Sequence, residues 1–472
     1  MNLVYMFADQ LRRQSCGYAG DPLARTPNID RLARESCELS EAVSGHPVCA
    51  PYRASLFTGK YTTSTGMVIN EIRISPDHET IAKVLNRAGY ETAYIGKWHL
   101  YANELGNHFD PKNSYIPAGP DRLGFDGFFA GYNFHHVNYG ENSYYHLNSP
   151  EKISYGEGAY EPDCQTDMAI RELERLADGK KPFALFLSLG TPHDPWDEDN
   201  VPAEWLDLFR DTEFTLPENY LPENDPHADG WARLSPAERE TIPDWMRVYY
   251  AMAADIDWNV GRMREAIERL GIKGDTIFVF TSDHGELFGA HGRRAKNIFY
   301  EEAVRVPFLM RCPGTIPEGV CDVCLNTVDI MPTLLSLCGL PIPAEVEGRD
   351  LSNVICSAAN ADEPEGALMM GTGATADWGE GFEWRAFRTK RYTYADYRPN
   401  GRSDGEELLF DNLLDPRQMV NLAHDASYSS VLADLKEKMG REMARVNDRF
   451  HPVSYYRENW VKDRIILRTK AD

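Results

Sequence analysis

The sequence has no apolar run near the roughly 20 residues that a membrane-spanning helix needs, and it has no run rich in Lys and Arg. Its 472 residues carry 49 Lys and Arg against 73 Asp and Glu, which gives a net charge of −24. We therefore expect neither a membrane protein nor a partner of nucleic acid. A small anionic substrate is compatible with this charge, because local cations can outweigh the global field inside a cleft.

Cysteine is sparse, and its number, nine, is odd. This pattern fits free thiols in a reducing compartment better than a disulfide framework. Cys321 and Cys324 form one CxxC, which is a weak zinc signal without a second pair. The N-terminus, MNLVYMFADQ, lacks the charged region and the cleavage site of a signal peptide. We expect a cytoplasmic protein; a trimmed secreted chain that was given a start Met is the alternative.

Internal repeats and low-complexity segments are also missing. The composition, 42% hydrophobic and 26% charged, is typical of a globular protein, and the chain is too long for one ordinary core. Aliphatic runs typical of buried parallel strands lie at 3–9, 90–96, 182–190, 276–283 and 306–310. Because helical patterns separate them, we predict an α/β fold with a large, mostly parallel sheet flanked by helices.

Two helical segments have recognisable ends. The pattern at 77–89 predicts a helix with Asp77 as its N-cap and Gly89 just beyond its C-terminus. A longer pattern covers about 243–270. Residues 105–165 and 195–242 break the alternation and predict long excursions from the sheet, which in compact domains are usually functional or mobile.

The character of the chain changes after about residue 365. The runs at 383–397 and 406–412 favour short antiparallel strands, and a final helix is expected at about 428–446. We therefore predict a catalytic domain at 1–364 and a smaller C-terminal subdomain at 365–472.

Polar side chains follow four of the predicted strands, at the edge where α/β sheets bind ligands. They are Asp9 and Gln10, Lys97 and His99, His193, and Asp283 and His284. Each has an ordinary structural explanation when taken alone, such as a capped turn, an exposed edge or a buried histidine. Together they favour a site, and their oxygen ligands suit a hard divalent cation. A histidine ligand is ordinary for manganese and less usual for calcium or magnesium.

The stretch GHPVCAPYRASLFTG places Cys49 beside Pro51 and Arg53. From these residues alone, Cys49 is an activated thiol, a metal ligand or a buried core residue.

Two segments of the chain resemble the signatures of a known enzyme family. CAPYRASLFTG, at 49–59, matches the CxPxR…TG signature of type I sulfatases, and GYETAYIGKWH, at 89–99, matches their second signature. Further similar segments lie at 26–33, 328–335, 347–351 and 408–423. The chain is identified on these motifs, from about residue 3 to 425, as a member of the formylglycine-dependent sulfatases of the alkaline phosphatase superfamily.

The resemblance implies a sulfuric ester hydrolase with a modified nucleophile. A sulfatase-maturation enzyme would read Pro51 and Arg53 and oxidise Cys49 to formylglycine. One hydroxyl of the hydrated aldehyde would attack sulfur, and the other would then expel sulfate. A single divalent metal ion, calcium in the first place with magnesium or manganese as alternatives, would be held by Asp9, Gln10, Asp283, His284 and the side chain at position 49.

The resemblance also implies roles for the remaining candidates. Arg53 would hold the aldehyde hydrate, and Lys97 and Lys296 would neutralise the sulfate oxygens. His99 would assist the elimination of sulfate, and His193 would protonate the leaving alcohol or only donate a hydrogen bond to it. Arg293 and Arg294, which lie near Lys296 in the sequence, are interpreted as a solvated surface.

The chain departs from the common sulfatase pattern at three positions. Gln10 stands where Asp is frequent, His284 where Asn is frequent, and Ala50 where Ser or Thr is common. Choline-sulfatase-like and phosphonate monoester hydrolase-like members of the superfamily tolerate the first two. Metal identity and strict sulfate preference are therefore open at this point.

The aromatic, Asn- and His-rich run at 124–146 suggests a small sulfated carbohydrate, such as a glycosaminoglycan fragment, as the substrate, because such side chains can stack on sugar rings. The other interpretation is that these aromatics only pack the excursion onto the body. Alternative functions are an aryl or choline sulfatase, a phosphonate monoester or phosphodiester hydrolase, and an inactive sulfate-binding relative whose Cys49 stays a thiol. The oligomeric state is open.

Overall fold

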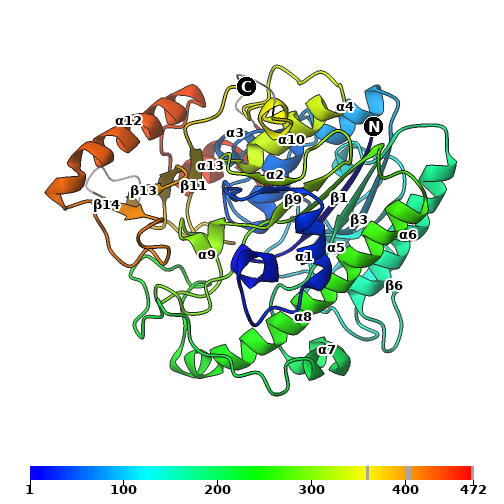
Figure 1. Cartoon of the computed structure of the whole chain (residues 1–472), viewed down its shortest axis with the longest axis horizontal. Coiled ribbons are helices and arrows are strands. Elements are labelled where there is room, and N and C mark those ends of the chain that lie inside the picture. The colour runs from blue at the N-terminus through cyan, green and yellow to red at the C-terminus, as the bar shows by residue number, and fades with distance from the viewer. Residues whose placement is uncertain (358–360, 400–404, 469–472) are drawn as a thin grey trace.

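The computed structural model describes residues 1–357, 361–399 and 405–468. Its centre is an eight-stranded sheet with the strand order β10-β2-β9-β8-β1-β7-β3-β4, visible edge-on in Figure 1. These strands are β1 (Asn2–Ala8), β2 (Cys37–Leu39), β3 (Glu91–Lys97), β4 (Phe129–Tyr132), β7 (Phe183–Ser188), β8 (Thr276–Ser282), β9 (Phe308–Arg311) and β10 (Gly319–Cys321). The predicted α/β class with a large, mostly parallel sheet is confirmed.

Both faces of the sheet are covered by helices. Tyr5 and Phe7 of β1 enter one core, whereas Val4 and Met6 enter the other, because successive side chains of a strand point to opposite faces. The first face packs against α2 (Cys49–Thr58), α4 (Ile81–Arg87) and α10 (Thr327–Leu337), and the second against α1 (Pro27–Arg34), α6 (Glu161–Asp178) and α8 (Pro236–Arg269). Strands buried on both faces explain the uninterrupted aliphatic runs of the sequence.

One strand runs against the expected direction. The segment predicted at 306–310 as a parallel strand forms β9, which is antiparallel to both β8 and β2. A parallel connection usually crosses over through a helix that covers the sheet. The chain between β8 and β9 instead builds the loop at the strand ends and contains only the short helix α9 (Glu301–Val304). Composition alone does not distinguish these two paths.

Three short strands of the central sheet, β2, β4 and β10, were not predicted. Each has three or four residues, which is too short for a clear pattern. Because β4 joins the sheet beside β3, the excursion at 105–165 returns to the sheet before it reaches α6. The same excursion carries α5 (Pro111–Ser114), β5 (Tyr144–Tyr145) and β6 (Ile153–Ser154).

Two helix boundaries differ from the prediction. The N-cap of α4 is Thr80, whose Oγ1 accepts a hydrogen bond from the Lys83 amide, and not Asp77; Gly89 does take the left-handed conformation expected after a helix, with φ at +85°. Helix α8 begins at Pro236, ahead of the predicted residue 243, because Ser235 and Glu238 form a capping box there. The second excursion is correspondingly shorter and contains α7 (Ala203–Asp207).

The C-terminal part forms a separate antiparallel sheet of β11 (Ala367–Gly371), β12 (Trp384–Arg388), β13 (Tyr392–Tyr397) and β14 (Glu406–Asp411). One face packs on the body of the protein and the other carries α12 (Ser429–Arg445), which agrees with the expected strands and final helix. The chain then adds α13 (Val453–Asn459), β15 (Val461–Lys462) and β16 (Ile465–Ile466). The boundary at 364/365 stays a prediction. The remaining short helices are α3 (Thr62–Thr65) and α11 (Ser352–Ile355).

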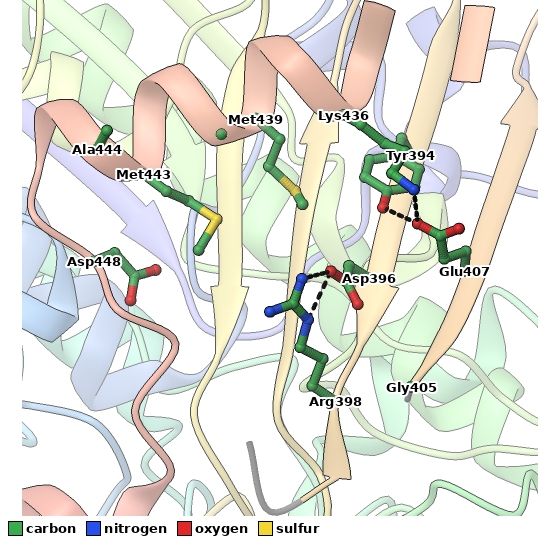
Figure 2. A pocket seen from close by; sticks show the side chains of 11 residues that line it. Tyr394, Asp396, Arg398, Gly405, Glu407, Lys436, Met439, Met443, Ala444 and Asp448 are labelled. Atoms are coloured by element: carbon green, nitrogen blue, oxygen red, sulfur yellow. Dashed lines mark hydrogen bonds and ion pairs between the residues drawn. The ribbon is translucent and has the colours of Figure 1, made fainter. Parts of the chain in front are cut away.

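A hollow of about 570 Å³ lies between α12 and the edge of this sheet. Figure 2 shows that its charged side chains bond to one another: Arg398 to Asp396, and Lys436 and Tyr394 to Glu407. Because these charges are already neutralised, we assign no ligand to the hollow.

Within the three described ranges, no helix combines the length and the apolarity that crossing a bilayer requires.

A buried ion pair joins the C-terminal sheet to the body. Arg388 of β12 donates two hydrogen bonds to the Glu301 carboxylate, at 2.7 and 2.9 Å, and also pairs with Glu41 at 2.8 Å. We expect Arg388→Leu to lower the free energy of unfolding by about 3 kcal/mol, because it removes two hydrogen bonds from the buried Glu301 carboxylate and leaves it the more distant Arg305, 3.6 Å away. Chemical denaturation of the variant and the parent measures this difference.

Arg441→Leu is the matched control, because Arg441 pairs with Glu365 and Glu437 on the surface of α12. It should leave the free energy of unfolding close to that of the parent, because solvent screens an exposed ion pair. Equal effects of the two substitutions would contradict the structural role of Arg388.

Candidate active site

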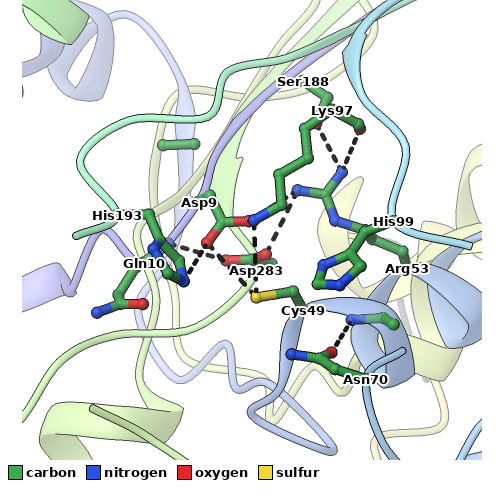
Figure 3. Close-up of polar contacts among 12 residues, drawn as sticks. Asp9, Gln10, Cys49, Arg53, Asn70, Lys97, His99, Ser188, His193 and Asp283 are labelled. Atoms are coloured by element: carbon green, nitrogen blue, oxygen red, sulfur yellow. Dashed lines mark hydrogen bonds and ion pairs between the residues drawn. The ribbon is translucent and has the colours of Figure 1, made fainter. Parts of the chain in front are cut away.

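The ends of four neighbouring strands meet at one place, as the sequence predicted. β1 leads to Asp9, β3 ends at Lys97, and β8 leads to Asp283. β7 ends at Ser188 and is followed by the loop that carries His193. Figure 3 shows these side chains gathered around Cys49, and each of them is buried.

Cys49 and Arg53 lie one turn apart in α2, which begins at Cys49 and is buried along its whole length. The positive end of the helix dipole therefore faces the cluster. The Arg53 guanidinium donates to Asp9 Oδ2 at 3.0 Å, to the Lys97 carbonyl at 2.6 Å and to Ser188 Oγ at 2.7 Å. It also lies 3.5 Å from Asp283 Oδ2. One arginine thus ties all four strand ends to the first turn of α2.

Two lysines flank the sulfur atom of Cys49. Lys97 Nζ lies 3.9 Å from Sγ and 2.7 Å from Asp9 Oδ2. Lys296 Nζ lies 3.4 Å from Sγ and donates to His193 Nε2 at 2.8 Å. His193 Nδ1 in turn bonds the Asp194 carbonyl at 2.8 Å. The site can therefore stabilise negative charge that develops beside position 49.

Four side chains could hold a metal ion: Asp9, Cys49, Asp283 and His284 offer ligand atoms that all lie within 4.8 Å of one another. His284 Nδ1 bonds the Gly285 carbonyl at 3.1 Å, which leaves Nε2 to face the other ligands. Asp283 Oδ2 is buried without a hydrogen bond inside the described part of the chain. Two carboxylates and one oriented imidazole fit a divalent cation, and the donor set does not decide among calcium, magnesium and manganese.

Gln10, the fifth predicted ligand, directs its side chain elsewhere. Its Oε1 accepts from Lys296 Nζ at 2.6 Å, and its Nε2 donates to Glu286 at 2.7 Å. Figure 3 shows the amide extending away from Cys49. The Gln10 backbone amide does contact the cluster, through a bond of 2.9 Å to Asp283 Oδ1. Metal ligation by the Gln10 side chain stays a prediction.

The two carboxylates differ in pKa. Burial and the neighbouring Asp9 charge raise the pKa of Asp283 to about 7, although nearby cations act in the opposite direction. Burial acts in the same direction on Asp9, but the positive charges of Lys97, Lys296 and Arg53 hold its pKa well below the ordinary range. A divalent cation between them would favour the ionised form of both.

Cys49 does not have the surroundings of a reactive thiol. Burial and the Asp9 charge raise its pKa to about 11, although Lys296 and Lys97 act in the opposite direction. Reactive cysteines have a lowered pKa, since the thiolate is the nucleophile. An unmodified Cys49 is therefore a protonated thiol at neutral pH, which argues against the activated-thiol alternative.

His99 is fully buried and stacks on Phe134, with ring centroids 4.3 Å apart. His136, two residues further along the same excursion, stacks on His193 at 4.6 Å. Most other aromatics of the run at 124–146 lie in the hydrophobic cores, namely Phe125, Phe129, Tyr132 and Tyr144. Packing therefore accounts for most of this run, while Phe134 and His136 border the site.

The interpretation of Arg293 and Arg294 as a solvated surface is wrong. Arg293 is buried and pairs with Asp225 at 2.8 Å, and Arg294, only partly exposed, pairs with Glu238 at 2.7 Å. The loop after β8 folds back against the second excursion, which buries Arg293 and covers most of Arg294. Residue spacing does not reveal such a contact between distant segments.

The weak zinc signal has no structural counterpart. Among the described residues, the only group of three or more His, Cys, Asp and Glu side chains close enough to hold a metal is the one around Cys49. Cys321 and Cys324 are free thiols outside it.

Three contributors to the site were not predicted from the sequence. Ser188 bonds Arg53, Glu286 fixes the Gln10 amide, and Asn70 Oδ1 accepts from the Ala50 amide at 2.9 Å. Ser188 ends its strand and Glu286 follows Asp283 closely, so position in the chain was a usable signal for both. Asn70 lies in an irregular segment that carries no such signal.

Comparison with known proteins identifies the class. The family model described as Sulfatase matches residues 1–340, and the model described as N-sulphoglucosamine sulphohydrolase, C-terminal, matches residues 289–445. The chain belongs to the sulfatase family of the alkaline phosphatase superfamily and is a sulfuric ester hydrolase.

Individual relatives match over almost the whole chain. An ulvan-active sulfatase of Formosa agariphila is 35% identical over 96% of this chain and 83% of its own length. An endo-4-O-sulfatase of Bacteroides thetaiotaomicron is 30% identical over 98% of this chain and 95% of its own. A solved B. thetaiotaomicron structure from work on glycosaminoglycan metabolism is 29% identical, with a TM-score of 0.81 over 97% of this chain and 98% of that one.

The ligand set can be tested by metal-dependent stabilisation. We expect saturating calcium or manganese to raise the melting temperature, since a ligand at 100 times its Kd stabilises the folded state by about 2.7 kcal/mol. Asp283→Asn should abolish most of this shift, because it removes a carboxylate from the cluster. Differential scanning calorimetry of metal-free protein, with and without added ion, measures it.

Gln10→Ala serves as the matched variant, and it should keep the metal-induced shift because the Gln10 amide bonds Lys296 and Glu286. A shift that disappears in Gln10→Ala as completely as in Asp283→Asn would make Gln10 a metal ligand after all.

Proposed function

We propose that this sulfatase hydrolyses the sulfate ester of a sulfated glycan, using a nucleophile made from Cys49. The placement of Cys49 carries the proposal: its Sγ lies between the ammonium groups of Lys97 and Lys296, 3.9 and 3.4 Å away, at the first residue of a buried helix. A tetrahedral anion bound there would lie close to both ammonium groups. The sulfur of a sulfate ester would then lie next to position 49.

Two groups complete this chemistry. Formylglycine at position 49 would supply a carbon with two hydroxyls, which a thiol cannot provide. A divalent ion held by Asp9, Asp283, His284 and residue 49 would supply Lewis acidity. Arg53, which bonds Asp9 and approaches Asp283, keeps these ligands in place.

Side chains of the protein itself would handle charge and protons. Lys97 and Lys296 balance the negative charge on the sulfate oxygens as the ester bond breaks. Lys296 and His193, 2.8 Å apart, share a proton that can pass to the leaving alcohol oxygen. Burial and the nearby lysines lower the pKa of His193 well below its ordinary value, so the ring rests neutral and the shared proton resides on Lys296. His99 would accept a proton in the second half of the reaction.

Two observations support a glycan as the alcohol part of the ester. The relatives described above are named for activity on ulvan and for endo-4-O-sulfatase activity, and the solved neighbour comes from work on glycosaminoglycans. In addition, the partly exposed His136 borders the site, with its ring stacked on that of His193. A sugar ring can pack its apolar face on such rings.

A phosphonate or phosphate ester is the second candidate. His284 among the ligands and Gln10 beside Asp9 favour it, because both are departures from the common sulfatase pattern. Lys97 and His99 at the end of β3 favour sulfate.

Matched substrates separate the two candidates. With protein that carries formylglycine, we expect kcat/KM for an aryl sulfate to exceed that for the matching aryl phosphonate, and sulfate to be released from ulvan or glycosaminoglycan oligosaccharides. Lys296→Met should lower turnover by about 10²–10³-fold, as removal of one preorganised charge-stabilising group does in other enzymes. Ion chromatography of sulfate and absorbance of the aryl alcohol provide the rates.

Phosphonate preference in this comparison would overturn the sulfatase reading of the site. Release of sulfate from the aryl ester alone, with none from any oligosaccharide, would remove the glycan from the proposal.

A further inference from the structure

Beside His99 lies a buried carboxylate that the mechanism above does not use. Glu71 Oε1 is 3.5 Å from His99 Nε2 and 3.8 Å from His108 Nδ1. Glu71 is 3% exposed and His99 is 0% exposed. The polar atoms of this group are unsatisfied: Glu71 Oε2, both ring nitrogens of His99 and His108 Nδ1 have no hydrogen-bond partner within the described part of the chain. Buried polar atoms normally have partners, so such a concentration requires an explanation.

The backbone holds the two residues in unfavourable conformations. Glu71 has φ at +60° and His99 has φ at +54°, both in the left-handed region that residues other than glycine rarely adopt. Strain of this kind persists only where the surroundings enforce it, and it concentrates at functional sites. The strained backbone is therefore a second, independent indication that Glu71 and His99 have a functional role.

The surroundings of Glu71 do enforce its position. Arg464, from the C-terminal segment, donates to the Glu71 carbonyl at 2.7 Å. The preceding residue, Asn70, donates its amide to the Thr375 carbonyl and accepts from Ala50 at the start of α2. Glu71 is thus fixed to the same helix turn that presents Cys49. Phe134 covers the group, with its ring stacked on His99 and edge-on to His108.

We propose that Glu71 is a positioning residue for His99: its carboxylate holds the proton of His99 on Nε2 and leaves Nδ1 free to accept a proton during sulfate release. This inference rests on the function proposed above. A carboxylate behind a histidine fixes the tautomer and stabilises the imidazolium that forms, which is the role of the aspartate in Ser-His-Asp triads.

The step balances in atoms and electrons. A hydroxyl on the carbon of residue 49 gives its proton to His99 Nδ1, and the O–H electron pair forms the C=O bond. The C–O bond to sulfate breaks and its electron pair leaves with sulfate. The imidazolium of His99 keeps its Nε2–H hydrogen bond to the Glu71 carboxylate. The proton gained at Nδ1 then passes to solvent and restores the neutral ring.

Rapid-quench kinetics on an aryl sulfate tests the proposal with the converted protein. Glu71→Gln should leave the first-turnover release of the aryl alcohol within about twofold of the parent, and sulfate should accumulate on residue 49, detected as a heavier Cys49-derived peptide. Steady-state turnover should fall by about 10–100-fold, less than the largest losses on removing a general base. Glu71→Asp, which keeps a carboxylate, should recover part of the rate.

A double-mutant cycle distinguishes an effect of Glu71 that acts through His99 from a general effect on the structure. If Glu71 acts through His99, then Glu71→Gln should add nothing to the loss caused by His99→Ala. Glu365→Gln, the same change at an exposed residue of the C-terminal part, is the control and should match the parent. Equal slowing of alcohol and sulfate release by Glu71→Gln, or additive losses in the cycle, would overturn the proposal.

A readout independent of catalysis uses the chain with unconverted Cys49. In ¹⁵N-histidine NMR spectra, assigned with His99→Ala, His99 should be the Nε2–H tautomer in the parent and lose that preference in Glu71→Gln. If the parent places no sulfate on residue 49, the proposed function fails, and the tautomer still decides whether Glu71 orients His99. A Nδ1–H tautomer in the parent would contradict the inference.

Discussion

The buried guanidinium of Arg53 is the contact on which the site depends. It is fully enclosed, and it bonds Asp9, the Lys97 carbonyl and Ser188 while approaching Asp283. These groups come from the ends of β1, β3, β7 and β8, so one planar cation fixes the relative position of four strands. A lysine has neither the fork of donors nor the permanent charge to do this. Since Arg53 lies one turn after Cys49 in α2, the same contact also fixes where the nucleophile is placed.

Charge balance explains why so many ionisable groups can be buried together. Asp9 lies against Arg53 and Lys97, and these cations keep it ionised in spite of burial. The remaining positive charge, on Lys296, faces Cys49. Burying an unpaired charge costs several kcal/mol, so the charged groups of the site are paired. The sheet and the helices that cover it hold these pairs in place. The protein as a whole is strongly acidic, yet the region around position 49 is locally cationic and suited to an anionic ester.

The sequence was sufficient for the four central strands of the sheet and for the position of most site residues, because both depend on local pattern. Aliphatic runs located β1, β3, β7 and β8, and the residues at or just after three of these strand ends gave Asp9, Lys97 and Asp283. What failed depended on contacts between distant segments. The direction of β9 and the burial of Arg293 against Asp225 are set by folding of the loop after β8, and no local pattern encodes them. Glu71 was missed for the same reason: it meets His99 only in three dimensions.

The central claim is that Cys49 is the precursor of the nucleophile, and the mass of the peptide that contains it tests this most directly. The chain would be co-expressed with a sulfatase-maturation enzyme, digested and analysed by mass spectrometry, beside a known sulfatase as a conversion control. The account predicts an aldehyde in place of the Cys49 thiol. An unmodified thiol in this chain, with the control converted, would contradict it and leave a sulfatase fold whose CxPxR motif is not read.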